Sequence, residues 1–422
     1  MMLIGGSMYL TRFADSMLQE RLNSAGAVLI RGPKGCGKTE TAMQKAKSIA
    51  RMDIDESVRI RMEIDPKLVL QGEVPRLIDE WQEYPIIWNH VRHEVDTRKQ
   101  KGQFILTGSS SVRDQARLHS GAGRFSVLTM RPMSLFERGW STGEVSLENL
   151  VAGVIPKSDE VPFSLHDLAG KIALGGWPGL IGTNTEDGLR AVRDYISLIA
   201  EVDINKVSGS NREPQKVRRL LQSFARNIST EAALVTLVKD TNGTDGFVST
   251  ETANTYIDAL ERLMVVEHLP AWNTHIRSSD TLRKSPKRHF TDPSLAIGAL
   301  GLSVDKLLAD LEYFGLLFES MVIRDLRIYA EVHEARVFHY RDSTNFEVDA
   351  ILEYPDGRWA AFEIKLGFGA QDAAAANLLK LAQKVDQKRM GTPVALTVIT
   401  ANGFAFRRKD GVNVIPIGVL TA

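Results

Sequence analysis

Cysteine is almost missing from this chain of 422 residues, since Cys36 is the only one. A single cysteine cannot form an intrachain disulfide, so the fold depends on packed cores and suits a reducing compartment. Long hydrophobic runs are missing too, because no apolar stretch approaches the roughly 20 residues that cross a bilayer. No basic stretch precedes the few apolar residues near the N-terminus, as an export signal requires. We therefore expect a cytoplasmic protein with no membrane partner.

An excess of either charge is also absent. Lysine plus arginine and aspartate plus glutamate each total 52, which gives a formal net charge of zero. Such a chain has no overall field that draws it to nucleic acid or to a membrane, so binding of either must rest on local patches. The length allows two to four domains with large cores.

One glycine-rich stretch is present and carries the clearest motif. Residues 32–39, GPKGCGKT, match the phosphate-binding loop G-x-x-x-x-G-K-[ST]. Its glycines let backbone N–H groups turn inward around phosphate oxygens. The apolar residues 27–30 predict a buried strand before the loop, and residues 38–50 predict a helix after it. We therefore expect this loop to bind ATP.

Each position in the loop has an expected role. Lys38 should reach the β- and γ-phosphates, and the Thr39 hydroxyl should bind Mg²⁺ where the helix begins. Cys36 occupies a permissive position, and the alternative is a redox brake on nucleotide binding. The residues expected to contact ATP here are Gly32, Pro33, Lys34, Gly35, Cys36, Gly37, Lys38 and Thr39.

Two carboxylates, Asp79 and Glu80, follow a second apolar strand end. In this position we expect Asp79 to hold Mg²⁺ through water and Glu80 to polarise the water that attacks the γ-phosphate. The alternative is a surface loop that happens to contain the pair. Residues 58–64 alternate apolar and polar side chains, which predicts another strand with one wetter face.

Small polar residues follow the next buried strand, residues 103–106. Thr107 and Ser109 should lie at the carboxyl edge of the sheet, where ligands bind in open α/β folds, and sense the γ-phosphate. Arg124 precedes a further strand and could supply charge to the transferring phosphoryl group, in its own subunit or in a neighbour of a homo-oligomer. An ordinary surface arginine is the alternative. The alternating pattern predicts a three-layer parallel-sheet α/β ATPase domain.

The middle of the chain is predicted to be helical. Residues 144–164 are rich in turn-forming and charged residues, which indicates a linker. Helix-like segments at 217–224, 231–239 and 250–263, followed by an apolar strand, have the order of a winged helix. Nearby basic residues could neutralise DNA phosphates, and a solvated face or a protein contact is the alternative. These residues are Lys216, Arg218, Arg219, Arg226, Arg283, Lys284, Lys287 and Arg288.

A hairpin near the C-terminus brings acidic residues together. If residues 355–357 form its loop, Asp349 lies opposite Glu363 with Cβ atoms roughly 5 Å apart, and Lys365 shares their face. The other face would carry an apolar surface that includes Val348. Two such carboxylates can share Mg²⁺ or Mn²⁺ beside a catalytic lysine, with Glu319 as a further ligand. The alternative is an exposed ion pair.

Taken together, these motifs resemble prokaryotic AAA-type ATPases that carry a C-terminal domain of the PD-(D/E)XK nuclease-like group. The resemblance rests on residues 32–39, 78–82, 104–110, 121–124 and 175–178, and on Asp349 with residues 363–365. It implies ATP binding and hydrolysis with Mg²⁺, a winged helix and a nuclease fold. The Pro-Asp of the motif name is Val348-Asp349 here, which leaves cleavage open.

We accordingly predict an α/β protein with an ATPase domain at 1–143, a linker at 144–164, a helical and winged-helix region at 165–290 and a nuclease-like domain at 291–422. The predicted function is ATP hydrolysis coupled to a DNA-associated nuclease-like domain. Two alternatives are a nucleotide-dependent switch with an inactive nuclease fold and a solely structural ATP-binding module.

Overall fold

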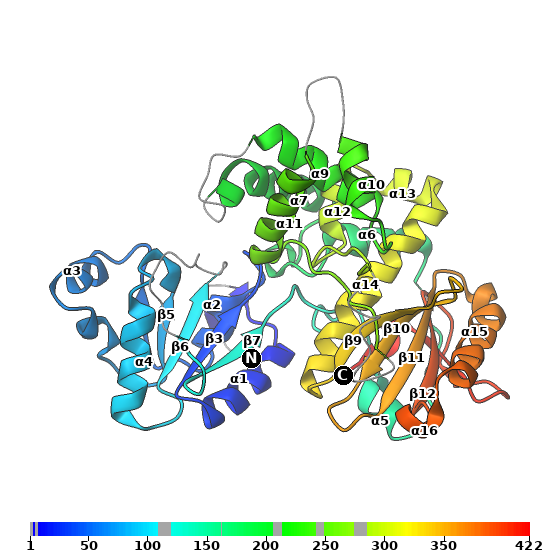
Figure 1. Ribbon diagram of the computed structural model, residues 1–422, viewed down its shortest axis with the longest axis horizontal. Coiled ribbons are helices and arrows are strands. Elements are labelled where there is room, and N and C mark those ends of the chain that lie inside the picture. The colour runs from blue at the N-terminus through cyan, green and yellow to red at the C-terminus, as the bar shows by residue number, and fades with distance from the viewer. Residues whose placement is uncertain are drawn as a thin grey trace.

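A computed structural model describes residues 3–4, 7–108, 120–161, 163–205, 213–241, 249–273 and 285–422. Figure 1 shows three parts: an N-terminal α/β part, a helical middle, and a C-terminal α/β part, with the long helix α14 (Leu311–Val332) beside the last. None of the described helices is both long and apolar enough to cross a membrane.

The N-terminal part is built on a five-stranded parallel sheet. Its strands are mostly buried, as a sheet covered on both faces requires. The strand order is β4 (Ser48–Arg51), β5 (Arg76–Asp79), β6 (Phe104–Gly108), β3 (Ala27–Arg31) and β7 (Phe125–Thr129). The predicted parallel-sheet α/β fold is therefore confirmed for this part.

Helices cover both faces of this sheet. One hydrophobic cluster joins a face to α1 (Phe13–Ser24) and α2 (Lys38–Met43), and a second joins the other face to α3 (Glu56–Ile64) and α4 (Ile87–Arg98). The helix after the phosphate-binding loop is shorter than predicted, because β4 begins at Ser48. Short elements complete the part: β1 (Leu3–Ile4), β2 (Ser7–Met8), η1 (Pro66–Leu70) and η2 (Trp81–Glu83).

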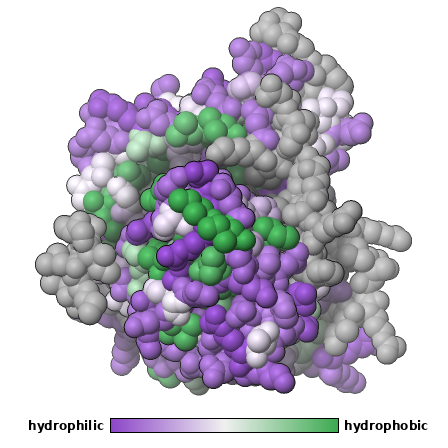
Figure 2. All heavy atoms as spheres, turned by 90° about the vertical axis from the view of Figure 1, so that its left-hand side faces the viewer, coloured by the Kyte–Doolittle hydropathy of each residue, from purple (hydrophilic) through white to green (hydrophobic). Residues whose placement is uncertain are grey.

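The strand predicted at residues 58–64 is wrong, because this segment is helix α3. The Asp55 side chain accepts a hydrogen bond from the Ser57 N–H and caps the helix. Val58 and Met62, four residues apart, are buried, while Ile64 is exposed. A strictly alternating pattern also places apolar residues four positions apart, so this sequence fits both the two-residue period of a strand and the period of a helix. Figure 2 faces this side of the molecule and shows hydrophobic side chains at the surface among hydrophilic ones.

The middle of the chain is helical, as predicted. Residues 265–271 and 285–291 then approach each other through antiparallel bridges, Val266 with Phe290 and Leu269 with Lys287. The helices are α6 (Leu165–Leu174), η3 (Pro178–Leu180), α7 (Thr185–Leu198), the π-helix η4 (Ile199–Asp203), α9 (Pro214–Arg226), α10 (Leu234–Thr241), α11 (Thr250–Arg262), α12 (Ser294–Leu300) and α13 (Val304–Ala309).

The C-terminal part contains a mixed six-stranded sheet. Helix α14 packs on one face and α15 (Gln371–Lys384) on the other. The strand order is β13 (Phe406–Arg407), β14 (Asn413–Pro416), β12 (Ala395–Thr400), β11 (Trp359–Lys365), β10 (Glu347–Glu353) and β9 (Arg336–Arg341). The remaining elements are η6 (Phe368–Ala370), α16 (Gln387–Met390) and η7 (Ile417–Val419).

The β10–β11 hairpin has the predicted register. Ala350 pairs with Phe362, and the Tyr354 N–H donates to the Arg358 carbonyl across the turn. The predicted apolar face is wrong at one position, since Val348 belongs to the cluster on the opposite face from Ala350. A register shift between β10 and β9 after Val348 explains this, because a bulge turns side chains to the other face.

Residues 144–164, predicted to be a linker, pack against the C-terminal part. Strand β8 (Val145–Ser146) pairs in parallel with β15 (Leu420–Thr421), and helix α5 (Leu147–Val151) follows it. The Ser141 hydroxyl donates to the Leu420 carbonyl, 279 residues away in the sequence. The last strand of the chain therefore lies beside the segment that follows the N-terminal part.

Candidate nucleotide site and a buried carboxylate cluster

The phosphate-binding loop has the conformation that its glycines permit. Gly35 and Gly37 have φ angles of 75° and 98°, in the left-handed region. A Cβ on Gly32 would lie 2.4 Å from the Met130 carbonyl oxygen, so only glycine fits there. The Lys38 Nζ donates to the carbonyl oxygens of Gly32 and Pro33, both at 2.9 Å, and its side chain lies inside the loop.

Three oxygen-bearing side chains meet at the carboxyl edge of the sheet. Asp79, at the end of β5, accepts hydrogen bonds from the hydroxyls of Thr39, at 2.8 Å, and Thr107. Parallel strands β5 and β6 bring Asp79 and Thr107 side by side. Carboxylate and hydroxyl oxygens are the hard ligands that Mg²⁺ prefers. The residues predicted to bind Mg²⁺ beside the phosphate loop are thus brought together and fit that ion.

Glu80 has a backbone conformation that is rare for a residue with a side chain. Its φ of 52° and ψ of 45° lie in the left-handed region, a conformation that occurs often at functional sites. The Gln82 side-chain amide donates to the Glu80 carboxylate. Glu80 therefore follows Asp79 at the same edge of the sheet, as its predicted role requires.

Arg124 lies at the other end of the sheet. It directly precedes β7, and its carbonyl accepts from the N–H of Ala27, the first residue of β3. Its guanidinium pairs with Asp96, at 2.9 Å. Five residues of strand separate this edge from the loop, so Arg124 does not reach the phosphate site of its own chain. Ser109 lies outside the described residues.

Residues far from the loop in sequence also contact it. The Arg12 guanidinium donates to the Cys36 carbonyl at 3.0 Å and to the Arg131 carbonyl at 2.9 Å. From the helical middle, the Asp203 carboxylate pairs with the Lys34 ammonium, and the Tyr195 hydroxyl donates to the Lys34 carbonyl at 3.3 Å. No motif marks these residues, so sequence reasoning missed them.

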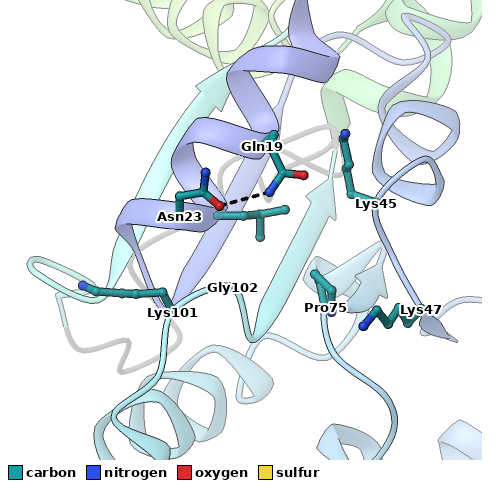
Figure 3. Close-up of a pocket in the computed structure, with 8 residues that line it drawn as sticks. Gln19, Asn23, Lys45, Lys47, Pro75, Lys101 and Gly102 are labelled. Atoms are coloured by element: carbon teal, nitrogen blue, oxygen red, sulfur yellow. Dashed lines mark hydrogen bonds between the residues drawn. The ribbon is translucent and has the colours of Figure 1, made fainter.

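A cavity of about 510 Å³ opens at the amino edge of the same sheet (Figure 3). Lys45 and Lys47 lie on one side and Lys101 on the other, and none of the described residues that line it is acidic. Gln19 and Asn23 on α1 are hydrogen-bonded to each other at its wall. Within the described part of the chain these lysines form no ion pair, and the Lys101 ammonium points away from Lys45 and Lys47 in Figure 3.

In the C-terminal part, the hairpin brings Asp349, Glu363 and Lys365 together as predicted. The Lys365 Nζ lies 3.1 Å from Asp349 Oδ2 and 2.7 Å from Glu363 Oε2. The Ile364 N–H also donates to Asp349 Oδ2, at 2.8 Å. The Asn377 amide of α15 donates to Glu363 Oε1 at 2.6 Å. Both carboxylates are therefore already held by protein donors.

A second lysine enters this cluster from outside the hairpin. Lys287 Nζ lies 2.8 Å from Glu319 Oε1, on α14, and 3.6 Å from Asp349 Oδ1. Burial and the nearby Asp349 raise the pKa of the Glu363 carboxyl, and burial raises the pKa of the Glu319 carboxyl. The cluster thus contains three carboxyls and two ammonium groups, most of them almost fully buried.

This donor set does not fit the divalent metal that the nuclease-like resemblance implies. Mg²⁺ needs about six oxygen ligands, but ammonium and N–H groups occupy these carboxylates. Among the residues that the structure describes, no group of three or more histidine, cysteine or acidic side chains is placed to hold a metal ion. The predicted metal role of Glu319, Asp349 and Glu363 is therefore not supported.

The predicted DNA contacts near the winged helix also need correction. Lys287 is buried in the carboxylate cluster, and Arg288 is buried with its Nε donating to the Ala232 carbonyl. Arg218 and Arg226 pair with Glu201 and Asp240. Arg283 and Lys284 lie outside the described residues. Lys287 and Arg288 cannot neutralise DNA phosphates in this conformation.

Family models match three consecutive segments of the chain. A family described as AAA domain matches residues 24–138, and the domains of unknown function DUF8612 and DUF4143 match residues 165–306 and 314–420. The chain therefore carries an AAA ATPase domain followed by two domains whose descriptions name no activity, and no nuclease is identified. No curated protein matches the chain.

Solved structures show only a distant likeness. The Walker-type ATPase of Pyrococcus abyssi aligns over 69% of this chain and 96% of its own, with 12% identity and a TM-score of 0.42. DnaA from Aquifex aeolicus bound to AMPPCP aligns over 59% and 86%, with 12% identity and a TM-score of 0.25. Both scores are too low to assign a function to this chain.

Proposed function

We propose that this chain binds and hydrolyses Mg-ATP at residues 32–39 and acts as a nucleotide-dependent switch. The observation that carries this proposal is the convergence of Thr39, Asp79 and Thr107 beside a glycine loop inside a matched AAA domain. Mg²⁺, when bound, would neutralise charge on the β- and γ-phosphates. Asp79 and Thr39 would hold it.

Each of the other residues has a role that its position supports. Lys38 would exchange its bonds to loop carbonyls for the β- and γ-phosphates. Glu80 would orient the attacking water and take up its proton. Arg124 can act only in the site of a neighbouring chain, which is the role we propose for it in a homo-oligomer.

Contacts leading away from the loop support the switch. Arg12 joins the Cys36 carbonyl to the Arg131 carbonyl. The Arg131 guanidinium in turn pairs with Glu267 at 2.6 Å and with Glu331 of α14 at 2.8 Å. A change in the loop on nucleotide binding would therefore reach the other two parts of the chain through hydrogen-bonded groups. The Lys34–Asp203 pair gives the helical middle a second contact with the loop.

DNA is the partner that we propose for this switch. Helices α9, α10 and α11 with the antiparallel pair after them have the order of a winged helix, which often binds DNA or protein. Three lysines line the cavity in Figure 3, and none of them forms an ion pair with the residues that the structure describes. Both features are consistent with contacts to a phosphate backbone.

A nuclease remains the second candidate function. The approach of Lys365 to both Asp349 and Glu363 favours it, because this is the constellation that the resemblance implies. Lys287 weighs against it, because its ammonium lies between two of the carboxylates. The switch without cleavage therefore accounts better for the observed geometry.

The first prediction tests ATP binding. With ATP at a hundredfold excess over Kd, bound Mg-ATP should stabilise the ATPase domain by about 2.7 kcal/mol. Lys38→Ala should abolish this stabilisation in a thermal-shift experiment, because it removes the phosphate-binding ammonium. Lys67→Ala, which removes an exposed lysine on η1, is the matched control and should keep it. An undiminished shift in Lys38→Ala would refute the assignment.

A further inference from the structure

Lys287, in the 285–291 segment of the helical middle, is deeply buried, and its ammonium enters the carboxylate cluster of the C-terminal part. Only 4% of its surface is exposed, and its ammonium lies between Glu319 of α14 and Asp349 of β10. Neither carboxylate belongs to the segment that carries the lysine. A buried ammonium is tolerated only where carboxylates compensate its lost hydration, so these two acidic groups are what keep Lys287 in place.

The backbone fixes this lysine firmly. Lys287 and Leu269 exchange both backbone hydrogen bonds, at 2.9 and 3.0 Å. The Leu269 strand continues to Trp272, whose N–H donates to the His339 carbonyl of β9 at 2.7 Å. The segment that presents Lys287 is therefore tied to the edge of the six-stranded sheet. A tethered ammonium has a high effective concentration at its carboxylates, which a dissolved cation must overcome.

The ammonium also occupies the position that a shared metal would need. A divalent ion bound by both Glu319 and Asp349 would have to lie between Glu319 Oε1 and Asp349 Oδ1, where Lys287 Nζ lies now. The other oxygen of Asp349 accepts from Lys365 and from the Ile364 N–H. Glu363 is likewise held by Lys365 and Asn377.

We propose that the Lys287 ammonium is the resident cation of the Glu319–Asp349 cluster and takes the place of a divalent metal. The cluster then joins the 285–291 segment to the C-terminal sheet instead of supporting metal-dependent cleavage. Residues of two matched domains are connected in this way, since Lys287 lies in the DUF8612 match and both carboxylates lie in the DUF4143 match. The inference does not depend on ATP hydrolysis.

Calorimetric titration of MnCl₂ into the full chain without ATP tests this proposal. Wild type should show no saturable heat from the cluster. Lys287→Met keeps much of the side-chain length but removes the charge, so it should gain Mn²⁺ binding and a rise in Tm of several degrees with Mn²⁺. Lys287→Arg keeps a cation and should gain neither. Lys306→Met, at an exposed lysine on α13, controls for the loss of one charge.

Two results would overturn the proposal. One is saturable Mn²⁺ binding to wild type that Glu319→Gln abolishes, because the cluster would then accept metal with the lysine in place. The other is a folded Lys287→Met protein that gains no Mn²⁺ binding.

A double variant covers the case in which Lys287→Met does not fold. Removing Lys287 leaves Glu319 buried and unpaired, so Lys287→Met/Glu319→Leu should regain most of the lost thermal stability. A double variant as unstable as Lys287→Met alone would show that Lys287 is not held as the counter-charge of Glu319, and would also overturn the proposal.

Discussion

The Asp79 carboxylate beside the phosphate-binding loop and the three carboxylates of the C-terminal cluster are held in opposite ways. Asp79 accepts from two neutral hydroxyls, and the residues that the structure describes offer it no ion pair. Glu319, Asp349 and Glu363 are instead bound to the ammonium groups of Lys287 and Lys365. Neutral donors leave the negative charge of a carboxylate available to a cation, whereas fixed ammonium groups cancel it.

Under the two proposals, this difference separates a candidate site that can exchange its cation from a cluster whose cation is fixed. At the nucleotide site the hydroxyl of Thr39 can rotate to present a lone pair to an arriving ion. In the C-terminal cluster a lysine has only donors to offer and cannot become a metal ligand while charged. Acidic residues that a sequence pattern brings together therefore do not suffice to predict metal binding. Whether a metal binds depends on the charge and hydrogen-bonding capacity of the groups that face those residues.

The largest expected effect on ATP hydrolysis comes from replacing Glu80, the proposed general base beside the phosphate-binding loop. Glu80→Gln keeps the side-chain shape but cannot take up a proton, so ATP hydrolysis should fall by roughly 100-fold while ATP affinity is retained. Phosphate release and nucleotide binding are measured on the same preparation.

Two other variants sharpen that result. Glu83→Gln changes an exposed carboxylate three residues away and should hydrolyse ATP at the wild-type rate. Glu363→Gln makes the same change in the lysine-bound cluster and should also leave hydrolysis unaltered. Wild-type turnover by Glu80→Gln would mean that another group is the base.

A pair of threonines gives a smaller and more direct contrast. Thr107→Val removes one hydroxyl from the Asp79 carboxylate, and a hydrogen bond to a charged group contributes about 1.5 kcal/mol, so Mg-ATP should bind roughly tenfold more weakly. Thr397 of β12 is equally buried, but its hydroxyl finds no hydrogen-bond partner among the residues that the structure describes. Thr397→Val should therefore leave ATP binding unchanged and not lower Tm. Equal affinities in the two variants would contradict the role of Thr107.

A further prediction concerns the ion pairs that join Glu267 of the helical middle to Arg131 and to Arg327 of α14. Burial alone would raise the pKa of Glu267, but the guanidinium groups of Arg131 and Arg327 outweigh it and lower the pKa to about 2. The ordinary value is 4.5, so this stabilisation is present above pH 4.5 and is lost as the pH falls toward 2.

Thermal denaturation between pH 2 and pH 5 measures this contribution. Glu267→Gln should flatten the dependence of Tm on pH across that window, whereas Glu148→Gln, at an exposed position on α5, should follow wild type. A wild-type slope in Glu267→Gln would show that other carboxyls cause the acid sensitivity.

Local patterns were enough to predict the parts of each site that lie close in sequence. The loop glycines, the Asp79 position and the register of the hairpin all follow from spacing over a few residues, and the structure agrees. Residues 58–64 failed because a short amphipathic segment satisfies both the strand period and the helix period.

The residues that pair with Lys34 of the loop and with Glu319 of the cluster lie outside the local patterns that sequence reasoning used. Asp203 approaches Lys34 across 169 residues, and Lys287 approaches Glu319 across 32. A lysine in a basic stretch has the same appearance in sequence whether it faces solvent or two buried carboxylates. Only the antiparallel pairing that turns Lys287 toward α14 distinguishes the two, and tertiary packing sets that pairing.

The pairing of β8 with β15 constrains the order in which the chain can assemble during translation. Strand β8 follows the ATPase domain directly, but its partner is synthesised about 270 residues later, which at 5–20 residues per second corresponds to roughly 14 to 54 seconds. The ATPase domain contains all five of its sheet strands before that point and can fold early. Until β15 emerges, Val145 and its neighbours have no strand to pair with. During this interval the nascent chain contains every strand of the N-terminal sheet but lacks the partner of β8.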